Sequence, residues 1–292
     1  MSVATDMLLG IDLGTTVLKV CAFDARSGAT LGQAARRLAV HKTPDGGREQ
    51  RPGAVDRAFS SAAAELRGLL GARWGRVAGI GLAAQGGSSI IADRRSGKAS
   101  TPMILWNDGR TRGHSSRLAG GIPTAFWRER VLRDFAPTGL GRLLWLKEER
   151  PELFRHDTIH AGAGEYLFFK MTGVWRQDAG NAIQIGSFNA ATKRLDPALF
   201  DLVGVPLSFV APLRQGHETA PLCAKAARSL ELPTGIPVAG PYIDQEAGYL
   251  SACAAAGRPL QCSLGTAWVG NYAVADDAVG ASPYQLVLPN PA

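Results

Sequence analysis

The sequence has little of what is typical of secreted, disulfide-bonded or membrane proteins. Its four cysteines are scattered through 292 residues, and none belongs to a Cys-x-x-Cys pair. This spacing indicates reduced, mostly buried thiols rather than a disulfide framework. No apolar run is long enough to span a bilayer, and Met1 to Met7 contains no basic cluster followed by an apolar stretch. We therefore expect a cytoplasmic protein with no signal peptide and no membrane partner.

Two glycine-rich phosphate-binding motifs are also missing. GxxxxGK[ST] does not occur, which excludes a P-loop enzyme, and the absence of GxGxxG argues against a dinucleotide fold or a kinase glycine-rich loop. The formal net charge is +7, but the basic residues form no long run. Because nucleic-acid binding requires a concentrated basic patch with interleaved aromatic residues, we expect no nucleic-acid partner. A generally basic surface is compatible with attraction of a phosphorylated cofactor.

What the sequence does contain is a real core and a mixture of strand and helix patterns. Hydrophobic residues make up 46% of the chain, close to the globular average. Strands joined by glycine-containing turns are predicted at Met7–Asp12, Leu18–Asp24 and Thr30–Arg37, as in an antiparallel meander. A helix is predicted at Ala54–Leu70 and a strand at Val77–Ala83. This order indicates an α/β or mixed architecture rather than a simple doubly wound sheet.

The later elements are predicted from weaker signals. Glycine, proline and charge predict a loop at His41–Pro52. Further strands are predicted at Ser89–Asp93 and Pro237–Ala239, and further helices at Gly139–Arg150, Tyr166–Met171, Thr219–Leu230 and Ala247–Ala256.

The turn after the first strand carries groups suited to phosphate. Gly14 lets the backbone approach an anion closely, and Thr15 and Thr16 offer hydroxyl and backbone donors. Lys19 can place a positive charge on a terminal phosphate. Asp12 ends a buried strand, where Mg²⁺ bound through water is a natural occupant. An ordinary hairpin with a structural aspartate remains the alternative at this point.

A second segment offers an acid–base group. Asp244 follows a short strand and opens a small-residue helix. A helix N-terminus favours its negative charge, and the carboxylate could accept a proton from a hydroxyl nucleophile. The alternative is that Asp244 only caps the helix. Further along, Leu264-Gly265-Thr266 repeats the Leu13-Gly14-Thr15 pattern after an apolar strand.

Taken together, these segments resemble the FGGY carbohydrate kinases, a branch of the actin-like ATPase superfamily. The resemblance covers nearly the whole chain and rests on several motifs in order. They are Leu9-Gly10-Ile11-Asp12-Leu13-Gly14-Thr15-Thr16 with Lys19, Glu49-Gln50-Arg51-Pro52, Ile104-Leu105-Trp106-Asn107-Asp108-Gly109-Arg110, Leu143-Leu144-Trp145-Leu146-Lys147, Pro151-Glu152-Leu153-Phe154, Tyr166-Leu167, Thr172-Gly173, Asp178 through Asn181-Ala182, Asp244 and Leu264-Gly265-Thr266.

The resemblance implies two ribonuclease-H-like α/β domains with a cleft between them. Residues 1–243 would form the sugar-binding domain, and residues 244–292 the start of a nucleotide-binding domain of the same type. The implied activity is ATP-dependent phosphorylation of a sugar or polyol hydroxyl, with a pentulose or related sugar as substrate and ATP and Mg²⁺ as cofactors. A homodimer is left open.

The resemblance also implies residue roles. Asp244 would be the general base, and Asp12 and Asp244 the metal ligands, with Asp12 acting through water. The implied phosphate-binding residues are Gly14, Thr15, Thr16, Lys19, Gly265 and Thr266. The implied substrate-binding residues are Gln85, Gly86, Gly87, Trp106, Asp244 and Gln245.

Two departures from the family pattern stand out. Xylulose-kinase-like members carry Gln-Met-His-Gly after the strand and glycerol-kinase-like members Gln-Arg-Glu-Thr, whereas this chain reads Gln85-Gly86-Gly87-Ser88. Two glycines in place of two large side chains predict a roomier site or contacts from the backbone. Trp106 could form an apolar wall for the substrate, or simply pack in the core. Gln245 resembles the residue that follows the base in glycerol-kinase-like members.

The second departure concerns length. Only 48 residues follow Asp244, whereas family members continue for most of another domain. We expect the second domain to be truncated, its apolar faces to be exposed, and this polypeptide alone to have negligible kinase activity. A non-catalytic sugar-binding relative that has lost the nucleotide half is an alternative, and an actin-like structural ATPase is a weaker one.

Overall fold

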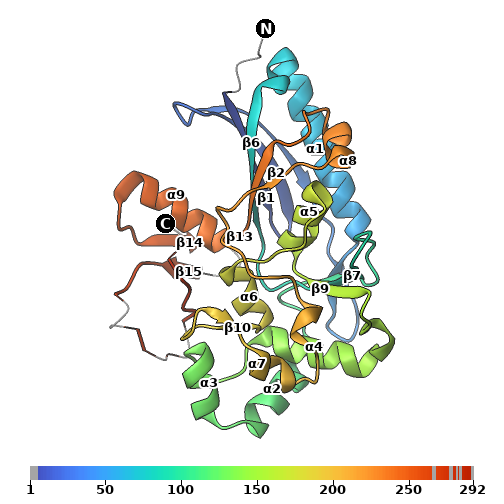
Figure 1. Cartoon of the computed structure of the whole chain (residues 1–292), viewed down its shortest axis with the longest axis vertical. Helices are drawn as coiled ribbons and strands as arrows, with labels where there is room; N and C mark the ends of the chain where they lie inside the picture. The colour runs from blue at the N-terminus through green and yellow to red at the C-terminus, as the bar shows by residue number, and fades with distance from the viewer. Residues whose placement is uncertain (1–5, 265–267, 276–278, 281, 283–284, 291–292) are drawn as a thin grey trace.

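The structure is a computed structural model that describes residues 6–264, 268–275, 279–280, 282 and 285–290. Figure 1 shows a twisted sheet with helices against it, a second group of helices below, and a C-terminal unit beside the sheet. Gly265 and Thr266, two predicted phosphate-binding residues, lie outside the described residues.

The central sheet has six strands in the order β12-β13-β6-β1-β2-β3. Their bounds are β1 Met7–Leu13, β2 Val17–Asp24, β3 Thr30–Arg37, β6 Val77–Ala84, β12 Ala220–Pro221 and β13 Pro237–Ile243. The pairs β1–β2 and β2–β3 are antiparallel, which confirms the predicted meander. Strand β6 runs parallel to β1, and β13 runs parallel to β6.

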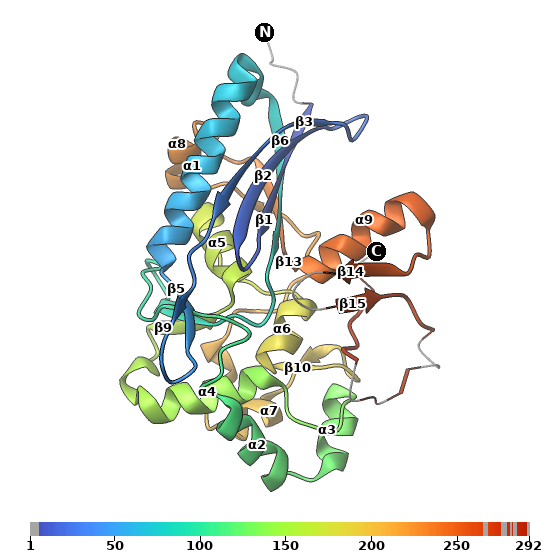
Figure 2. The same ribbon diagram turned by 180° about the vertical axis from the view of Figure 1, so that it is seen from behind.

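Helices cover one face of this sheet. The alternation of side chains along β1 buries Met7, Leu9, Ile11 and Leu13 on the same side, while Leu8 on the other side is exposed. The buried side packs against α1 (Pro52–Leu70), α5 (Ala163–Thr172) and α8 (Ala224–Leu230), which lie together in Figure 2. In α1, the apolar residues recur at helical spacing and form the stripe that faces β2 and β3.

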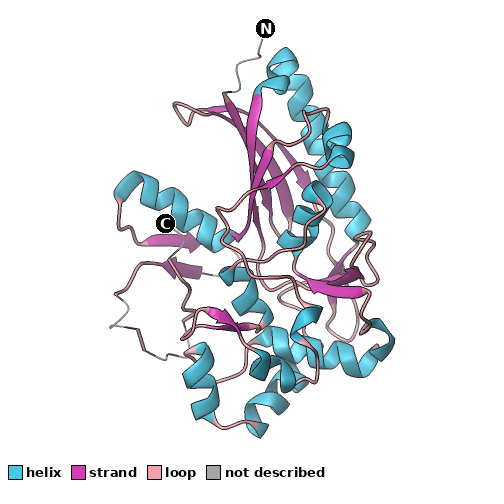
Figure 3. Cartoon of the chain, in the orientation of Figure 1, coloured by secondary structure: helices cyan, strands magenta, loops and turns pink. Residues whose placement is uncertain are grey.

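A second, mostly helical group lies below the carboxyl end of the sheet (Figure 3). Its own core contains Trp127, Leu140, Leu143 and Phe200. Its helices are α2 Arg112–Gly121, α3 Thr124–Val131, α4 Thr138–Glu149, α6 Ala179–Ile185 and α7 Pro197–Asp201. Its short strands are β4 His41–Lys42, β5 Arg48–Gln50, β7 Ile90–Asp93, β8 Met103–Ile104, β9 Thr158–Ala161, β10 Phe188–Asn189 and β11 Arg194–Leu195. Three 3₁₀ helices, Gly71–Arg76, Pro151–Leu153 and Leu207–Phe209, complete the connections among the described residues.

The C-terminal unit begins directly after β13. Helix α9 spans Asp244–Ala256, and β14 (Gln261–Leu264) pairs with β15 (Trp268–Asn271) in an antiparallel ribbon. In α9, only Glu246 and Tyr249 are buried, so this helix is less closely packed than its small residues suggested. No helix in the described ranges is both long and apolar enough to cross a membrane.

Three sequence predictions need correction. The expected loop at His41–Pro52 contains β4 and β5, which are too short to give a strand pattern. The expected helix at Thr219–Leu230 begins only at Ala224, because Ala220–Pro221 pairs with β13. The Leu222 N–H also donates to the Ile236 carbonyl, and the Leu222 carbonyl accepts from the Gly235 N–H. The expected strand at Pro237–Ala239 continues to Ile243, because a register shift between Ala239 and Tyr242 accommodates a proline without an N–H group.

Candidate active site

Three neighbouring strands end at the same edge of the sheet. Leu13 of β1 lies opposite Ala84 of β6, and Ala84 lies opposite Ile243 of β13. The turn at residues 14–16, the loop at residues 85–88 and the start of α9 therefore emerge side by side. In open α/β sheets, ligands bind beyond the carboxyl ends of parallel strands. This edge is the candidate site.

Asp12 and Asp244 both lie at this edge, Asp12 near the end of β1 and Asp244 directly after β13. Asp12 pairs across the hairpin with Lys19, whose Nζ lies 3.6 Å from Asp12 Oδ2, and both side chains are about half exposed. Removal of hydration by the surrounding protein raises the pKa of Asp244, and the negative charge of Asp12 raises it further. The Gln245 N–H donates to Asp244 Oδ1 over 3.0 Å and opposes this rise. The two carboxylates thus share one electrostatic environment while Asp244 stays solvent-accessible.

The phosphate turn has a buried and an exposed part. The Thr15 hydroxyl donates to Gln85 Oε1 at 3.0 Å and accepts from Trp106 Nε1 at 3.1 Å, so its hydrogen-bonding capacity is largely used inside the protein. The Thr16 side chain is exposed. The Gly14 N–H closes the turn on the Val17 carbonyl at 3.0 Å. Thr16 and Lys19, together with the half-exposed Asp12, therefore remain side chains of this hairpin that a ligand can reach.

Gln85 joins the phosphate turn to the substrate loop from beneath. It is 2% exposed, and its Oε1 accepts from the hydroxyls of Thr15 and Ser88. Its Nε2 donates to Gln50 Oε1 at 3.3 Å and to the Gly14 carbonyl at 3.5 Å. Its amide thus bonds four protein groups, and it supports the surface rather than forming it.

Other side chains occupy the space beside the two glycines. A Cβ on Gly86 would lie 3.0 Å from Ile243 Cγ2 and 3.3 Å from Gln184 Cγ. A Cβ on Gly87, whose φ is +73°, would lie 3.2 Å from Trp106 Cβ and 3.3 Å from Gln184 Oε1. The roomier site expected from the sequence is therefore not found at these Cβ positions. Gln184 is half-buried, and its amide makes no hydrogen bond with any described residue.

Sequence reasoning missed a buried arginine behind this wall. Arg142 of α4 is 1% exposed, and its guanidinium donates to the Gly87 carbonyl and to Ser89 Oγ, the latter at 3.2 Å. It also donates to the carbonyls of Leu105 and Trp106, both at 3.2 Å. Burial lowers the pKa of Arg142 to about 10, and the side chain stays charged at neutral pH. The only sequence signal was a cation within the apolar pattern of the helix.

An acidic pair lies behind the start of α9. Asp178 caps α6 by accepting from the Asn181 N–H at 2.9 Å, and the Asn181 side chain also donates to the Pro241 carbonyl at 3.1 Å. Burial, followed by the charge of Asp178, raises the pKa of Glu246 to about 9. The protonated form of Glu246 is therefore favoured at neutral pH, next to the buried carboxyl of Asp178. One oxygen of each carboxyl, Asp178 Oδ2 and Glu246 Oε2, has no hydrogen-bond partner among the described residues.

Gln245 faces the C-terminal ribbon. Asn271 Nδ2 donates to Gln261 Oε1 at 2.5 Å and lies 3.5 Å from Gln245 Oε1. Gln245 therefore sits between the sheet edge and β15.

A metal bound at this edge would have few protein ligands. No group of three or more histidine, cysteine or acidic side chains in the described ranges could enclose an ion. Mg²⁺, however, keeps most of its water and needs only one or two protein carboxylates together with substrate phosphates. The partly exposed Asp12, with Asp244 close enough to feel its charge, fits that mode of binding.

Comparison with known proteins agrees with this geometry. Residues 7–251 match the N-terminal domain of the FGGY family of carbohydrate kinases. Xylulose kinase from Bacillus subtilis (strain 168) is 25% identical over 266 residues, which cover 90% of this chain and 52% of that protein. Glycerol kinase from Alkalilimnicola ehrlichii is 27% identical over 271 residues, covering 89% of this chain and 53% of that protein.

Solved structures share the fold. Xylulose kinase from Rhodospirillum rubrum superposes with a TM-score of 0.77 at 23% identity, over 84% of this chain and 51% of that one. Plasmodium falciparum glycerol kinase with ADP superposes with a TM-score of 0.74 at 18% identity, over 86% of this chain and 50% of that one. The chain spans about half the length of the curated relatives it matches. The α/β fold is that of the FGGY N-terminal domain, an actin-like ATPase fold, and the chain belongs to the FGGY family of carbohydrate kinases.

Proposed function

We propose that the protein to which this chain belongs transfers the γ-phosphoryl group of ATP to a hydroxyl of a sugar or polyol, a pentulose or a related carbohydrate. The observation that carries this proposal is the position of Asp244. It opens α9 at the shared sheet edge, stays accessible, and has a raised pKa beside the charge of Asp12. Such a carboxylate is a suitable acceptor for a hydroxyl proton.

The proposed roles follow from what each side chain can still reach. Asp244 takes the proton of the attacking hydroxyl, and the positive end of α9 stabilises its charge. Lys19 and Thr16 bind the terminal phosphates of ATP. Gly14, whose N–H is bonded to the Val17 carbonyl, lets the turn approach the phosphates closely, and Thr15 shapes the turn through Gln85. Asp12, and Asp244 beside it, would hold Mg²⁺, which neutralises phosphate charge when bound. Gly265 and Thr266 remain proposed phosphate contacts from the opposite side.

The proposed substrate wall consists of Gly86, Gly87, Trp106 and Gln184, with Gln245 next to the base. Trp106 is held by its indole bond to Thr15, and both the Gly87 and Trp106 carbonyls are held by Arg142. A sugar lying here would meet a backbone surface at the glycines and the free amide of Gln184. Gln85 contributes by fixing this surface from below.

We propose a domain boundary at the end of β13. Residues 1–243 complete the sheet and would carry sugar binding, whereas residues from 244 onward would begin the nucleotide-binding part. The support is that β13 is integral to the six-stranded sheet, and that α9 leaves this sheet edge to pack on β14 and β15 as well as on β13 and β6.

The proposal is tested by ligand binding and turnover. The 292-residue chain is screened by thermal shift against pentuloses, hexuloses and polyols, because a ligand that binds only the folded state raises apparent stability. Sugars that bind are then assayed for sugar-dependent ADP formation by the complete enzyme. Stabilisation by at least one sugar together with ADP formation is expected. A complete enzyme that consumes no ATP with any sugar that binds would refute the proposal.

A further inference from the structure

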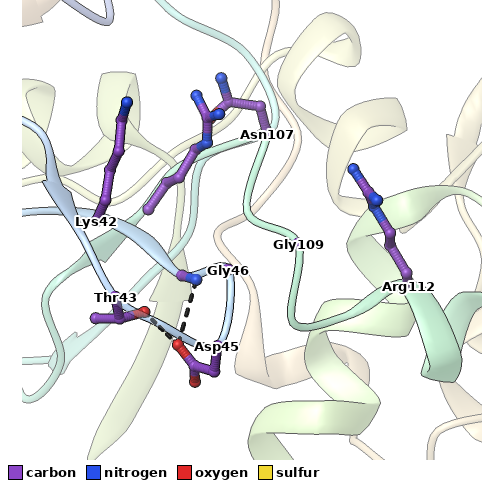
Figure 4. Close-up of a pocket in the computed structure, with 9 residues that line it drawn as sticks. Lys42, Thr43, Asp45, Gly46, Asn107, Gly109 and Arg112 are labelled. Atoms are coloured by element: carbon purple, nitrogen blue, oxygen red, sulfur yellow. Dashed lines mark hydrogen bonds between the residues drawn. The ribbon is translucent and has the colours of Figure 1, made fainter.

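A pocket separate from the sheet edge lies between the β4–β5 hairpin and the start of α2. Its volume is about 350 Å³. Figure 4 shows Lys42 and Arg112 on either side of the segment that carries Asn107 and Gly109. Arg48 also lines it. A pocket of this size is at the lower end of the range for small metabolites.

The pocket has positive charge that the protein does not neutralise. The side chains of Lys42, Arg48 and Arg112 make no ion pair or hydrogen bond with any residue that the structure describes. Asp108 and Glu49 are paired with Arg110. Asp45 also lines the pocket and stays negatively charged, because its partners, the Thr43 hydroxyl and the Gly47 N–H, are neutral donors. Three cations therefore face one carboxylate, and the pocket is positive on balance.

The walls are fixed to each other. The Gly109 N–H donates to the Gly46 carbonyl at 3.0 Å, and the Arg48 N–H donates to Asp108 Oδ2 at 2.8 Å. The Leu105 N–H donates to the Arg48 carbonyl at 2.9 Å. A Cβ on Gly109 would lie 3.2 Å from the Gly46 carbonyl oxygen, so glycine permits this close approach. The three cations are therefore presented by a preorganised backbone, which reduces the entropy lost on binding.

Asn107 adds a group that an inorganic anion does not require. Its Oδ1 is buried and has no hydrogen-bond partner. A buried acceptor without a donor is costly, and a turn of the Asn107 side chain toward the pocket would let this covered oxygen accept from a ligand hydroxyl. The pocket thus combines anion-binding cations with one hydroxyl acceptor.

We propose that this pocket binds a phosphorylated sugar or polyol, with its phosphate against Lys42, Arg48 and Arg112 and a hydroxyl on Asn107. The site is distinct from the candidate active site, since its lining comes from the hairpin and from residues 107–112. It lies next to the substrate wall along the chain, because Asn107 follows Trp106.

Calorimetric titration of the 292-residue chain without nucleotide tests the proposal. The probes are inorganic phosphate, glycerol 3-phosphate, ribose 5-phosphate and the unphosphorylated glycerol and ribose. We expect Lys42→Ala and Arg112→Ala each to weaken both phosphate and sugar-phosphate binding by about tenfold or more, because each removes a charge-assisted contact. Asn107→Ala should weaken sugar-phosphate binding and leave inorganic phosphate unchanged. Arg95→Ala, an exposed arginine outside the pocket, is the matched control and should change neither.

A Lys19→Ala variant separates the pocket from the active site, and its sugar-phosphate binding at the pocket should persist. Binding lost in Lys19→Ala but unaffected in Lys42→Ala and Arg112→Ala would overturn the proposal. Equal phosphate affinity in the pocket variants and the Arg95→Ala control would overturn it as well. Because no turnover is measured, these outcomes are independent of whether the proposed kinase activity is correct.

Discussion

At the scale of single residues, the candidate site depends on which polar groups are already engaged. Thr15 and Gln85 hydrogen-bond each other; Thr15 also bonds Trp106, and Gln85 also bonds Ser88. Asp244 has only a local backbone donor, and Gln184 has no partner among the described residues. Groups with unused capacity are the ones that can bind or react, so Asp244 and Gln184 are the residues to test first.

The first prediction concerns Asp244. In the complete enzyme, Asp244→Asn removes the proton acceptor but keeps the size and polarity of the side chain. We expect turnover to fall by about 10²–10⁴-fold, with sugar affinity largely unchanged in calorimetric titration. Asp201→Asn, at an exposed acid on α7, is the control and should retain full turnover. An Asp244→Asn enzyme close to wild-type turnover would refute the assignment of the base.

The second prediction concerns the substrate wall. Replacing Gly86-Gly87 by Met-His should lower stability by roughly 1–3 kcal/mol, because side chains already lie within 3.3 Å of both Cβ positions and Gly87 has a positive φ. Adding Gln184→Ala should recover part of this loss and alter which sugars bind. Thermal unfolding and a calorimetric sugar panel measure the two effects, with Gln33→Ala on β3 as control. An unchanged sugar profile in Gln184→Ala would show that Gln184 is not part of the wall.

At the scale of elements, those that depend on local sequence patterns were predicted well. Features that depend on contacts between distant parts of the chain were not. The meander and α1 were predicted because their periodicity and turns are contained in short segments. Ala220–Pro221 was misassigned because its strand partner, β13, lies elsewhere in the sequence. Likewise, Asp12 and Asp244 were expected to meet through the family resemblance, but no pattern pointed to Arg142, which binds two loops distant in sequence.

The third prediction concerns the first turn of α5. Glu165 is fully buried, both carboxyl oxygens lack a side-chain partner, and burial raises its pKa from 4.5 to about 8. The folded state therefore holds a proton that the unfolded state releases, so this residue makes stability fall as pH rises from about 4.5 to about 8. We expect Glu165→Gln to reduce that fall.

Urea unfolding at pH 5, 6, 7 and 8 measures the effect. Glu152→Gln is the matched control, because the hydrogen bond from Arg150 lowers the pKa of that exposed carboxyl, and its replacement should leave the fall in stability between pH 5 and 8 unchanged. Part of the fall in stability with rising pH should remain in the Glu165→Gln protein, because Glu246, paired with Asp178, also has a raised pKa. Identical slopes in wild type and Glu165→Gln would mean that Glu165 is ionised in the folded protein.

At the scale of the whole molecule, the apolar surface is unevenly distributed. Large hydrophobic side chains are exposed along one C-terminal stretch, where Trp268 is 82% exposed. They are Leu260, Leu264, Trp268, Tyr272 and Val274. Exposed apolar faces were expected in this region, and the described residues confirm them. Large apolar side chains exposed close together along the chain are candidates for packing against further protein, and the chain spans about half the length of its relatives.

The last prediction follows from that surface. We expect the isolated 292-residue chain to bind its sugar but to show negligible sugar-dependent ATP consumption. The sugar wall and Asp244 are present in the described structure, whereas phosphoryl transfer also requires two lobes that close, exclude water and align the phosphate with the hydroxyl. Calorimetric titration with the best sugar from the screen and a coupled ADP assay measure the two properties on one preparation, with the Asp244→Asn chain reporting any contaminating kinase. Robust turnover by the isolated wild-type chain, absent from the Asp244→Asn chain, would show that these 292 residues contain a complete nucleotide site and that the nucleotide binds elsewhere than proposed.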